Sequence, residues 1–220
     1  MPADDQVLTE EELHALETIL TKLRGQGGDL PAPLFRFITE TTPTPNVDLL
    51  VRDEAKGTLL AWRDDAFGSG WHVPGSIIRH REEVAHRIAA CARDEFGCAV
   101  EVADRPVALT EIFDDRGHTL GLCYRTTLRG IPGKRVVGQD ERPEVGDLRW
   151  FLTLPAELYP SHFVYRDLLD ALDNGWRGQG VRLFTHKAGS RDSAQPSPGG
   201  SIRSDVPLTG PTRSSRTSTR

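Results

Sequence analysis

One stretch of the chain decides how it is expected to fold: Trp71-His-Val-Pro-Gly-Ser76, then Arg81-Glu-Glu83, then Ala92-Arg-Asp-Glu-Phe-Gly97. It begins with a Pro-Gly turn, passes an acidic residue, and ends in two adjacent acids and a glycine. Between Glu83 and Phe96 there is no Pro or Gly, which favours a helix, and Gly97 is a natural C-terminal stop. A turn followed by a helix that ends in acids can hold a divalent cation against a diphosphate.

The helix is predicted to turn Glu95 toward the protein interior. Apolar residues recur at every fourth position and form one stripe of an amphipathic helix. They are Val84, Ile88, Ala92 and Phe96. At about 100° per residue, Glu95 projects between Ile88 and Ala92. Because an inward carboxylate needs a cation or hydrogen-bond donors, we expect Glu95, with Asp94 on the flank, to bind a metal ion.

This stretch resembles the Nudix box, whose pattern is G-x5-E-x7-R-E-U-x-E-E-x-G-U, where U is an aliphatic residue. Glu82 takes the first glutamate position, Asp94 and Glu95 take the Glu-Glu pair, and Gly97 takes the closing glycine. The sequence departs from the pattern at three positions, which are Ser76, Ala90 and Cys91. Because Ala90 replaces the usual arginine partner of Glu82, Arg79 and Arg87 are the alternatives for that partner.

The resemblance implies a metal-dependent hydrolase of nucleoside diphosphates linked to another group. The family binds metal through the acids of the box helix and a carbonyl in the preceding glycine loop. Carried over to this chain, the metal ligands are Gly75, Glu82, Asp94, Glu95 and Glu144. Carboxylates and a carbonyl suit Mg²⁺, with Mn²⁺ as the alternative ion. Glu95 and Glu144 are the catalytic candidates, Glu144 either as ligand of a second metal or as general base.

Within the family, the GDP-mannose mannosyl hydrolases share further features with this chain. Their Trp-Phe-Val-Pro-Gly is similar to the segment that starts at Trp71. Asp48 and Arg63 match an active-site aspartate and an arginine that contacts the diphosphate, so both are predicted to bind substrate. Glu144 stands where these enzymes have a metal-binding glutamine, but Val145 replaces their catalytic histidine. A nucleotide-sugar substrate is therefore one expectation, and which bond is cleaved is left open.

The rest of the chain favours an α+β fold of the Nudix type, an α/β/α sandwich with a mixed sheet. A capping box at Thr9 and Glu12 predicts a helix over residues 9–24, and residues 163–172 predict a second helix beyond the box. Residues 63–70 read as a polar loop. The predicted strands are residues 47–51, 58–62, 99–102, 107–113, 119–128 and 148–152.

Composition divides the chain into three regions. Residues 1–33 form an N-terminal helix followed by a Gly- and Pro-rich linker over 25–33. Residues 34–184 form the Nudix-like domain. Residues 185–220 are rich in Ser, Pro, Gly, Thr and Arg, and are predicted to form a disordered tail.

Charge and hydropathy narrow the class of partner. The 220 residues are 37% hydrophobic and 27% charged, with a net charge of -5, which argues against a generic nucleic-acid binder. No run approaches the roughly 18 apolar residues of a membrane span. We expect a cytoplasmic protein with a nucleotide-derived small-molecule substrate and no nucleic-acid or membrane partner, and a homodimer is an open alternative. The three cysteines fit no zinc spacing and are expected to be reduced.

Three ambiguities remain at the level of sequence. His72, His80 and His118 can titrate near neutral pH, and none is assigned as catalyst. Phe67 and Trp71 can either stack on a base or pack in the core. Because the box has lost ligands, a non-catalytic domain that binds a nucleotide or a protein is the alternative to an enzyme.

Overall fold

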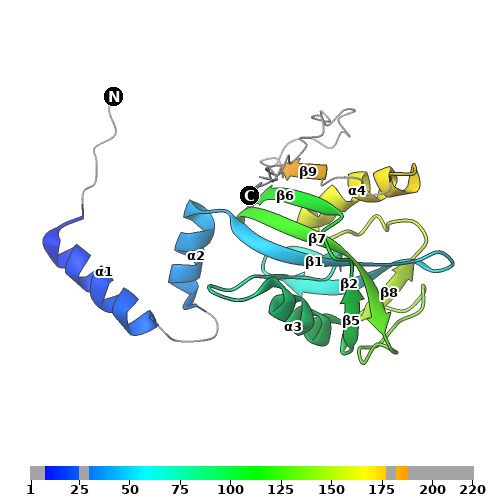
Figure 1. Cartoon of the computed structure of the whole chain (residues 1–220), viewed down its shortest axis with the longest axis horizontal. Helices are drawn as coiled ribbons and strands as arrows, with labels where there is room; N and C mark the ends of the chain where they lie inside the picture. The colour runs from blue at the N-terminus through cyan, green and yellow to red at the C-terminus, as the bar shows by residue number, and fades with distance from the viewer. Residues whose placement is uncertain (1–7, 25–29, 177–181, 188–220) are drawn as a thin grey trace, which may run out of the picture. The chain divides into compact units, whose positions relative to one another are not determined.

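The computed structural model describes residues 8–24, 30–176 and 182–187. The chain divides into two compact units, residues 1–36 and residues 37–220. The helices are α1 (Glu10–Leu23), α2 (Ala32–Thr41), α3 (Val84–Phe96) and α4 (Val164–Asp173), with the short 3-10 helix η1 (Pro160–Phe163) before α4 (Figure 1). The strands are β1 (Thr44–Asp53), β2 (Gly57–Asp65), β3 (Gly68–His72), β4 (Gly75–Ile77), β5 (Ala99–Val102), β6 (Ala108–Asp114), β7 (Gly117–Arg129), β8 (Leu148–Phe151) and β9 (Arg182–Lys187). Among these residues no helix is long and apolar enough to cross a membrane.

Helix α1 in the first unit begins at the predicted capping box. The Glu12 backbone N–H donates to the Thr9 hydroxyl at 3.3 Å, and the Thr9 N–H donates to the Glu12 carboxylate at 2.8 Å. These two bonds satisfy backbone donors that the first helical turn leaves free. No residue of α1 is buried, so its apolar side chains add no core to this unit.

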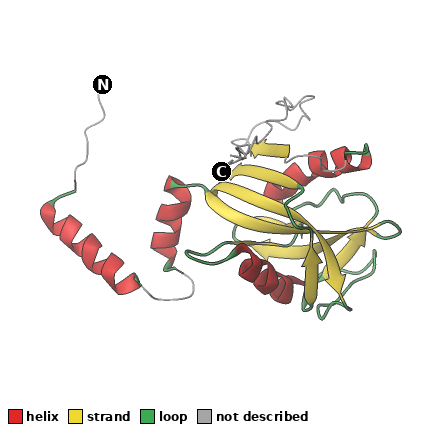
Figure 2. Cartoon of the chain, in the orientation of Figure 1, coloured by secondary structure: helices red, strands yellow, loops and turns green. Residues whose placement is uncertain are grey.

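The second unit is built on a mixed sheet (Figure 2). The strand order along its main path is β3-β2-β1-β7-β6-β9, with β4 beside β1, β5 beside β7, and β8 beside β2. Strands β1 and β7 run parallel, as do β6 and β9, whereas the other pairs are antiparallel. This topology matches the mixed sheet predicted from the sequence.

Each face of the sheet carries its own apolar core, because alternate residues of a strand point to opposite sides. On β1, Val47, Leu49 and Val51 pack in the cluster that contains Ile88 and Phe96 of α3. Leu50 packs in the opposite cluster, with Val164 and Leu168 of α4. The two helices therefore cover opposite faces, which confirms the predicted α+β sandwich. Helix α3 ends at Gly97, whose φ of 69° lies in the left-handed region that favours glycine.

Three segments differ from the sequence-based predictions. Helix α2 begins inside the predicted linker. Its proline, Pro33, is tolerated because it falls in the first helical turn, where no intrahelical N–H bond is lost. Residues 63–70 form the β2–β3 hairpin and not a loop. Residues 185–187, assigned to the tail, belong to β9, and residues 188–220 lie outside the described part of the chain.

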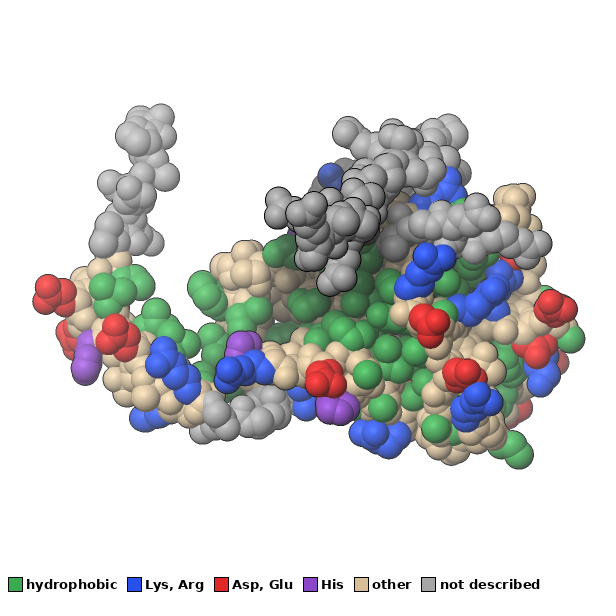
Figure 3. Space-filling view, in the orientation of Figure 1, with side chains coloured by type: hydrophobic (Ala, Val, Ile, Leu, Met, Phe, Trp, Pro, Cys, Tyr) green, Lys and Arg blue, Asp and Glu red, His purple; other side chains and the backbone are tan. Residues whose placement is uncertain are grey.

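On the second unit, acidic and basic side chains are interspersed on the face seen in Figure 3. A site for an anion must therefore be built from individual cations. One such cation, Arg63, lies on the β2–β3 hairpin.

Candidate active site

One face of the β2–β3 hairpin gathers polar side chains. The register pairs Ala61 with His72, Arg63 with Gly70, and Asp65 with Gly68. Because directly opposite residues share a face, Arg63, Asp65 and His72 point to the same side. A Cβ on Gly70 would lie 2.5 Å from the backbone nitrogen of Tyr159, so glycine allows the segment before η1 to cross this face.

Glu95 of α3 reaches this face through His72. The His72 Nε2 atom lies 3.6 Å from the Glu95 carboxylate, and the Glu95 side chain is 22% exposed. Both ring nitrogens of His72 are buried and lack a hydrogen-bond partner within the described residues. Burial raises the pKa of Glu95, but interaction with His72 and the charges of His72, Arg63 and Lys134 outweigh it, so the pKa falls below its usual value. Glu95 is thus an ionised carboxylate turned inward, as the helical projection predicted.

Arg63 lies next to this pair, and its guanidinium makes few contacts with the described residues. Its guanidinium carbon stands 5.4 Å from the centre of the Tyr159 ring, and its Nε atom is 3.9 Å from Asp65. The Tyr159 hydroxyl donates to Asp65 at 2.8 Å. Since a guanidinium carries five N–H donors and these contacts use few of them, Arg63 can receive a phosphate. Its predicted role as a substrate-binding residue remains a prediction with suitable geometry.

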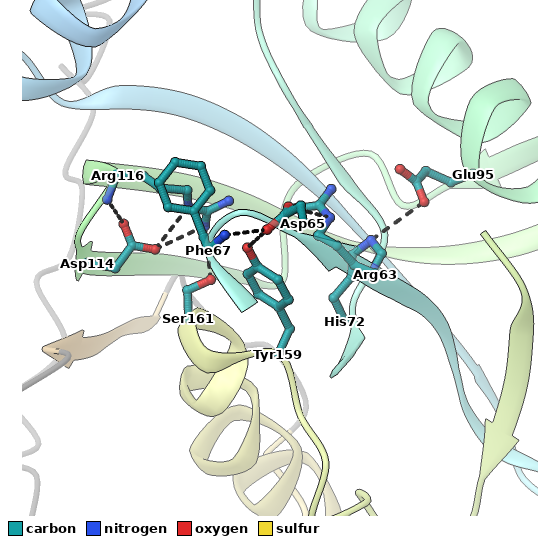
Figure 4. A network of polar contacts seen from close by, with 9 residues as sticks. All are labelled: Arg63, Asp65, Phe67, His72, Glu95, Asp114, Arg116, Tyr159 and Ser161. Carbon is teal, nitrogen blue, oxygen red and sulfur yellow. Dashed lines mark hydrogen bonds and ion pairs between the residues drawn. The ribbon is translucent and has the colours of Figure 1, made fainter. Parts of the chain in front are cut away.

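A second arginine extends the same group of side chains (Figure 4). Arg116, on the β6–β7 turn, donates to Asp114 from Nε at 3.1 Å and from Nη2 at 3.0 Å, and to the Ser161 hydroxyl at 2.9 Å. It lies over the rings of Tyr159, at 5.6 Å, and Phe67, at 5.8 Å. Arg63 and Arg116 therefore both lie against Tyr159.

Glu82 has a structural partner. Arg87 donates to its two carboxylate oxygens from Nε at 2.9 Å and Nη2 at 2.8 Å, and reaches the Ser76 hydroxyl at 3.1 Å. The Arg79 backbone N–H also donates to Glu82. The hydrogen bonds from Arg87 lower the Glu82 pKa. Arg87 supplies a side-chain pair for Glu82, which ties the loop before α3 to the helix. The predicted role of Glu82 as a metal ligand stays a prediction.

Replacing Arg87 with lysine is expected to lower the free energy of unfolding by about 2 kcal/mol, because an ammonium cannot reproduce the two-pronged contact with a partly buried carboxylate. Urea denaturation of the variant measures this loss. The matched control is Arg93→Lys, since Arg93 is exposed on the same helix. An equal and small effect in both variants would show that the Glu82–Arg87 pair does not hold the loop.

Asp48, predicted to bind substrate, is buried with only 3% exposure. Its carboxylate accepts hydrogen bonds from the Asn46 amide at 2.6 Å and the Thr110 hydroxyl at 3.2 Å. A Cβ on Gly75 would lie 2.5 Å from one Asp48 oxygen, and a Cβ on Gly121 would lie 2.1 Å from the other. Asp48 therefore acts inside the core, where it packs beneath the glycine turn. Direct contact with substrate would need this site to open.

The remaining predicted ligands do not gather into one group. Asp94 is exposed, and Cys91, in the vacant glutamate position, is buried; burial and the charges of Glu95 and Asp48 raise the pKa of Cys91. Glu144 is exposed and lines an open hollow of about 460 Å³ with Trp62 and Asp64. Within residues 8–24, 30–176 and 182–187, no three His, Cys, Asp or Glu side chains are placed to hold a metal together.

The histidines and aromatic residues singled out in the sequence differ in burial and in contacts. Trp71 is 1% exposed and belongs to the core, whereas Phe67 is 55% exposed. His118 pairs with Glu111 and stacks on Phe113, and His80 is exposed. The sequence analysis missed Tyr159 and Arg116, because neither has a neighbouring motif and each joins the site only through the fold.

The chain is similar to several solved structures at low sequence identity. A UDP-X diphosphatase is 19% identical, covers 79% of this chain and 89% of its own, and has a TM-score of 0.49. An ADP-ribose pyrophosphatase from Streptococcus suis 89-1591 is 20% identical, with coverage of 66% and 100% and a TM-score of 0.46. A Nudix hydrolase from Nitrosomonas europaea is 15% identical, with coverage of 66% and 81% and a TM-score of 0.49. No protein-family model and no curated protein matches the sequence.

Proposed function

We propose that the chain is a metal-dependent hydrolase that cleaves the diphosphate of a nucleoside diphosphate linked to another moiety, such as a sugar. The observation that carries this proposal is the position of Glu95. It is an inward carboxylate 3.6 Å from His72 Nε2, with Arg63 among the groups whose charge lowers its pKa. Where a carboxylate lies beside a guanidinium with free donors, the carboxylate can bind a cation while the guanidinium binds a phosphate.

The residues fit a magnesium ion whose coordination shell is completed by the substrate. Mg²⁺ in proteins keeps several waters and binds one or two carboxylates plus substrate phosphates, so it does not need three preassembled side chains. Glu95 and Asp94, adjacent at the end of α3, would hold it together with the Gly75 carbonyl, and Mn²⁺ is the alternative ion. When bound, the cation neutralises phosphate charge and lowers the pKa of a water.

The protein's own groups have distinct roles in this proposal. Arg63 binds a phosphate of the substrate, and the Tyr159–Asp65 hydrogen bond at 2.8 Å fixes the surface on which Arg63 lies. His72 lies 3.6 Å from the Glu95 carboxylate on its buried side and would orient it. Pre-set donors of this kind stabilise charge that develops during reaction. Glu144 remains a predicted general base, but the hollow that it lines is formed with Trp62 and Asp64, which point to the face of β2 opposite Arg63.

Attack is expected at phosphorus and not at the sugar carbon, because Val145, at the position of the catalytic histidine in the mannosyl hydrolases, is 68% exposed and accepts no proton. Hydrolysis of a nucleotide sugar in ¹⁸O-water, followed by mass analysis of the products, tests this bond assignment. The proposal predicts label in a phosphate product, with nucleoside monophosphate and sugar phosphate formed. Label found only in the sugar hydroxyl would contradict it.

A non-catalytic binding module is the second candidate. The observation that favours it is the buried Cys91 in a ligand position, together with the lack of a three-residue metal group in the described ranges. A thermal shift with nucleotide but no turnover in the presence of Mg²⁺ would support this candidate. Metal-dependent turnover would exclude it.

A further inference from the structure

We propose that Phe67 and Arg116 form the subsite that holds the nucleobase of the substrate. This inference rests on the proposed function, since it assigns the end of the substrate remote from Glu95. It comes from the position of one exposed aromatic ring beside one fixed guanidinium.

Phe67 is presented by a fixed turn. It lies between β2 and β3 with 55% of its surface exposed. Its backbone N–H donates to the Asp65 carboxylate at 2.9 Å, and the same oxygen accepts the Tyr159 hydroxyl at 2.8 Å. The turn is thereby tied to the segment before η1. An aromatic ring held in this way offers a flat surface with little conformational freedom to lose on binding.

Arg116 is the partner that favours a base over a phosphate. Its charge is already paired with Asp114 at 3.0 Å, and the Ser161 hydroxyl accepts another of its N–H groups at 2.9 Å. A guanidinium that is neutralised in this way is a weaker anion site than Arg63, whose ion pair with Asp65 spans 3.9 Å. It remains a planar cation 5.8 Å from the Phe67 ring, and both planes can stack with a heterocycle.

The order of the groups fits an extended nucleotide. Figure 4 shows Glu95 and His72 at one end, Arg63, Asp65 and Tyr159 in the middle, and Phe67 with Arg116 at the other end. Side-chain contacts link these groups in the same order, from Glu95 through Tyr159 to Arg116. A reacting phosphate near Glu95 and a second phosphate at Arg63 would leave the base at Phe67.

Equilibrium binding separates the base from the phosphates. Calorimetric titrations with ADP and UDP, without added metal, are compared with titrations of inorganic pyrophosphate, which has no base. For Phe67→Leu we expect the Kd of both nucleotides to rise roughly 10- to 100-fold, as loss of stacking on one aromatic ring predicts. The Kd of pyrophosphate should be unchanged, and Phe67→Trp should retain nucleotide affinity.

The matched control is Phe163→Leu, because Phe163 also lies beneath an arginine, Arg166, at 5.0 Å but outside this group of side chains. Unchanged nucleotide affinity in Phe67→Leu, equal weakening of pyrophosphate, or no nucleotide binding by the unmodified protein would each overturn the subsite. Turnover with unchanged affinity would leave the proposed function standing. The expected affinity pattern without any turnover would support the subsite and overturn the hydrolase.

Discussion

Glu95→Gln is expected to abolish turnover while the fold is retained. Glutamine keeps the shape of the side chain but removes the negative charge that would hold the cation. The loss should reach about a thousandfold or more, the scale on which removal of one pre-set electrostatic group slows an enzyme. Steady-state rates on a nucleoside diphosphate derivative, with Mg²⁺ in excess, measure it.

The control for this variant is Glu83→Gln. Glu83 precedes the same helix, is exposed, and makes no side-chain cap hydrogen bond, so its charge should not affect catalysis. Circular dichroism of both variants separates loss of activity from loss of structure. A folded Glu95→Gln protein with normal turnover would remove Glu95 from the proposed site.

Asp48→Asn is expected to stabilise the protein at pH 8 by about 3 kcal/mol. Burial raises the pKa of Asp48 from 3.8 to about 6, against the lowering effect of neighbouring polar groups, among them the hydrogen bonds from Asn46 and Thr110. A tenfold change in the proton affinity of a group on folding corresponds to about 1.4 kcal/mol of stability. Asparagine keeps an acceptor for Asn46 and removes the cost of a buried charge.

The direction of the pH dependence follows from proton uptake. Between pH 3.8 and about 6 the folded protein binds more protons at Asp48 than the unfolded chain does, so this residue reduces stability as pH rises, and the reduction is complete above about pH 6. The variant should therefore gain stability at pH 8 and gain little near pH 4. Urea denaturation at both pH values measures it, with exposed Asp104→Asn as control. An equal gain at both pH values would show that the Asp48 charge is not the cause.

Much of the fold could be predicted from the sequence because its signals are local. The capping box of α1, the apolar stripe of α3 and its stop at Gly97 depend on residues within a few positions of one another. Helix α2 and strand β9 lack such signals. Strand β9 is defined by its pairing with β6, and a pairing partner is not visible in six residues of sequence.

The site was less accessible to prediction because its contacts span the chain. Tyr159 and Asp65, which share a hydrogen bond, are 94 residues apart. For Glu82 and Asp48, the resemblance to the Nudix family implied a metal ligand and a substrate contact. In the structure Glu82 pairs with Arg87, and Asp48 is buried in the core. The function of a carboxylate depends on which side chain reaches it, and the sequence shows that only when the partner lies nearby.

Metal-dependent turnover by the unmodified protein is the most direct test of the proposed hydrolase. The measurement incubates the full chain with ADP-ribose, GDP-mannose, UDP-sugars and nucleoside triphosphates, with Mg²⁺ or with EDTA, and identifies the products by mass. Cleavage of at least one diphosphate-linked nucleotide with Mg²⁺, and loss of that cleavage with EDTA, is the result we predict. Cleavage that persists undiminished in EDTA, or no cleavage of any substrate by a folded protein, would contradict it.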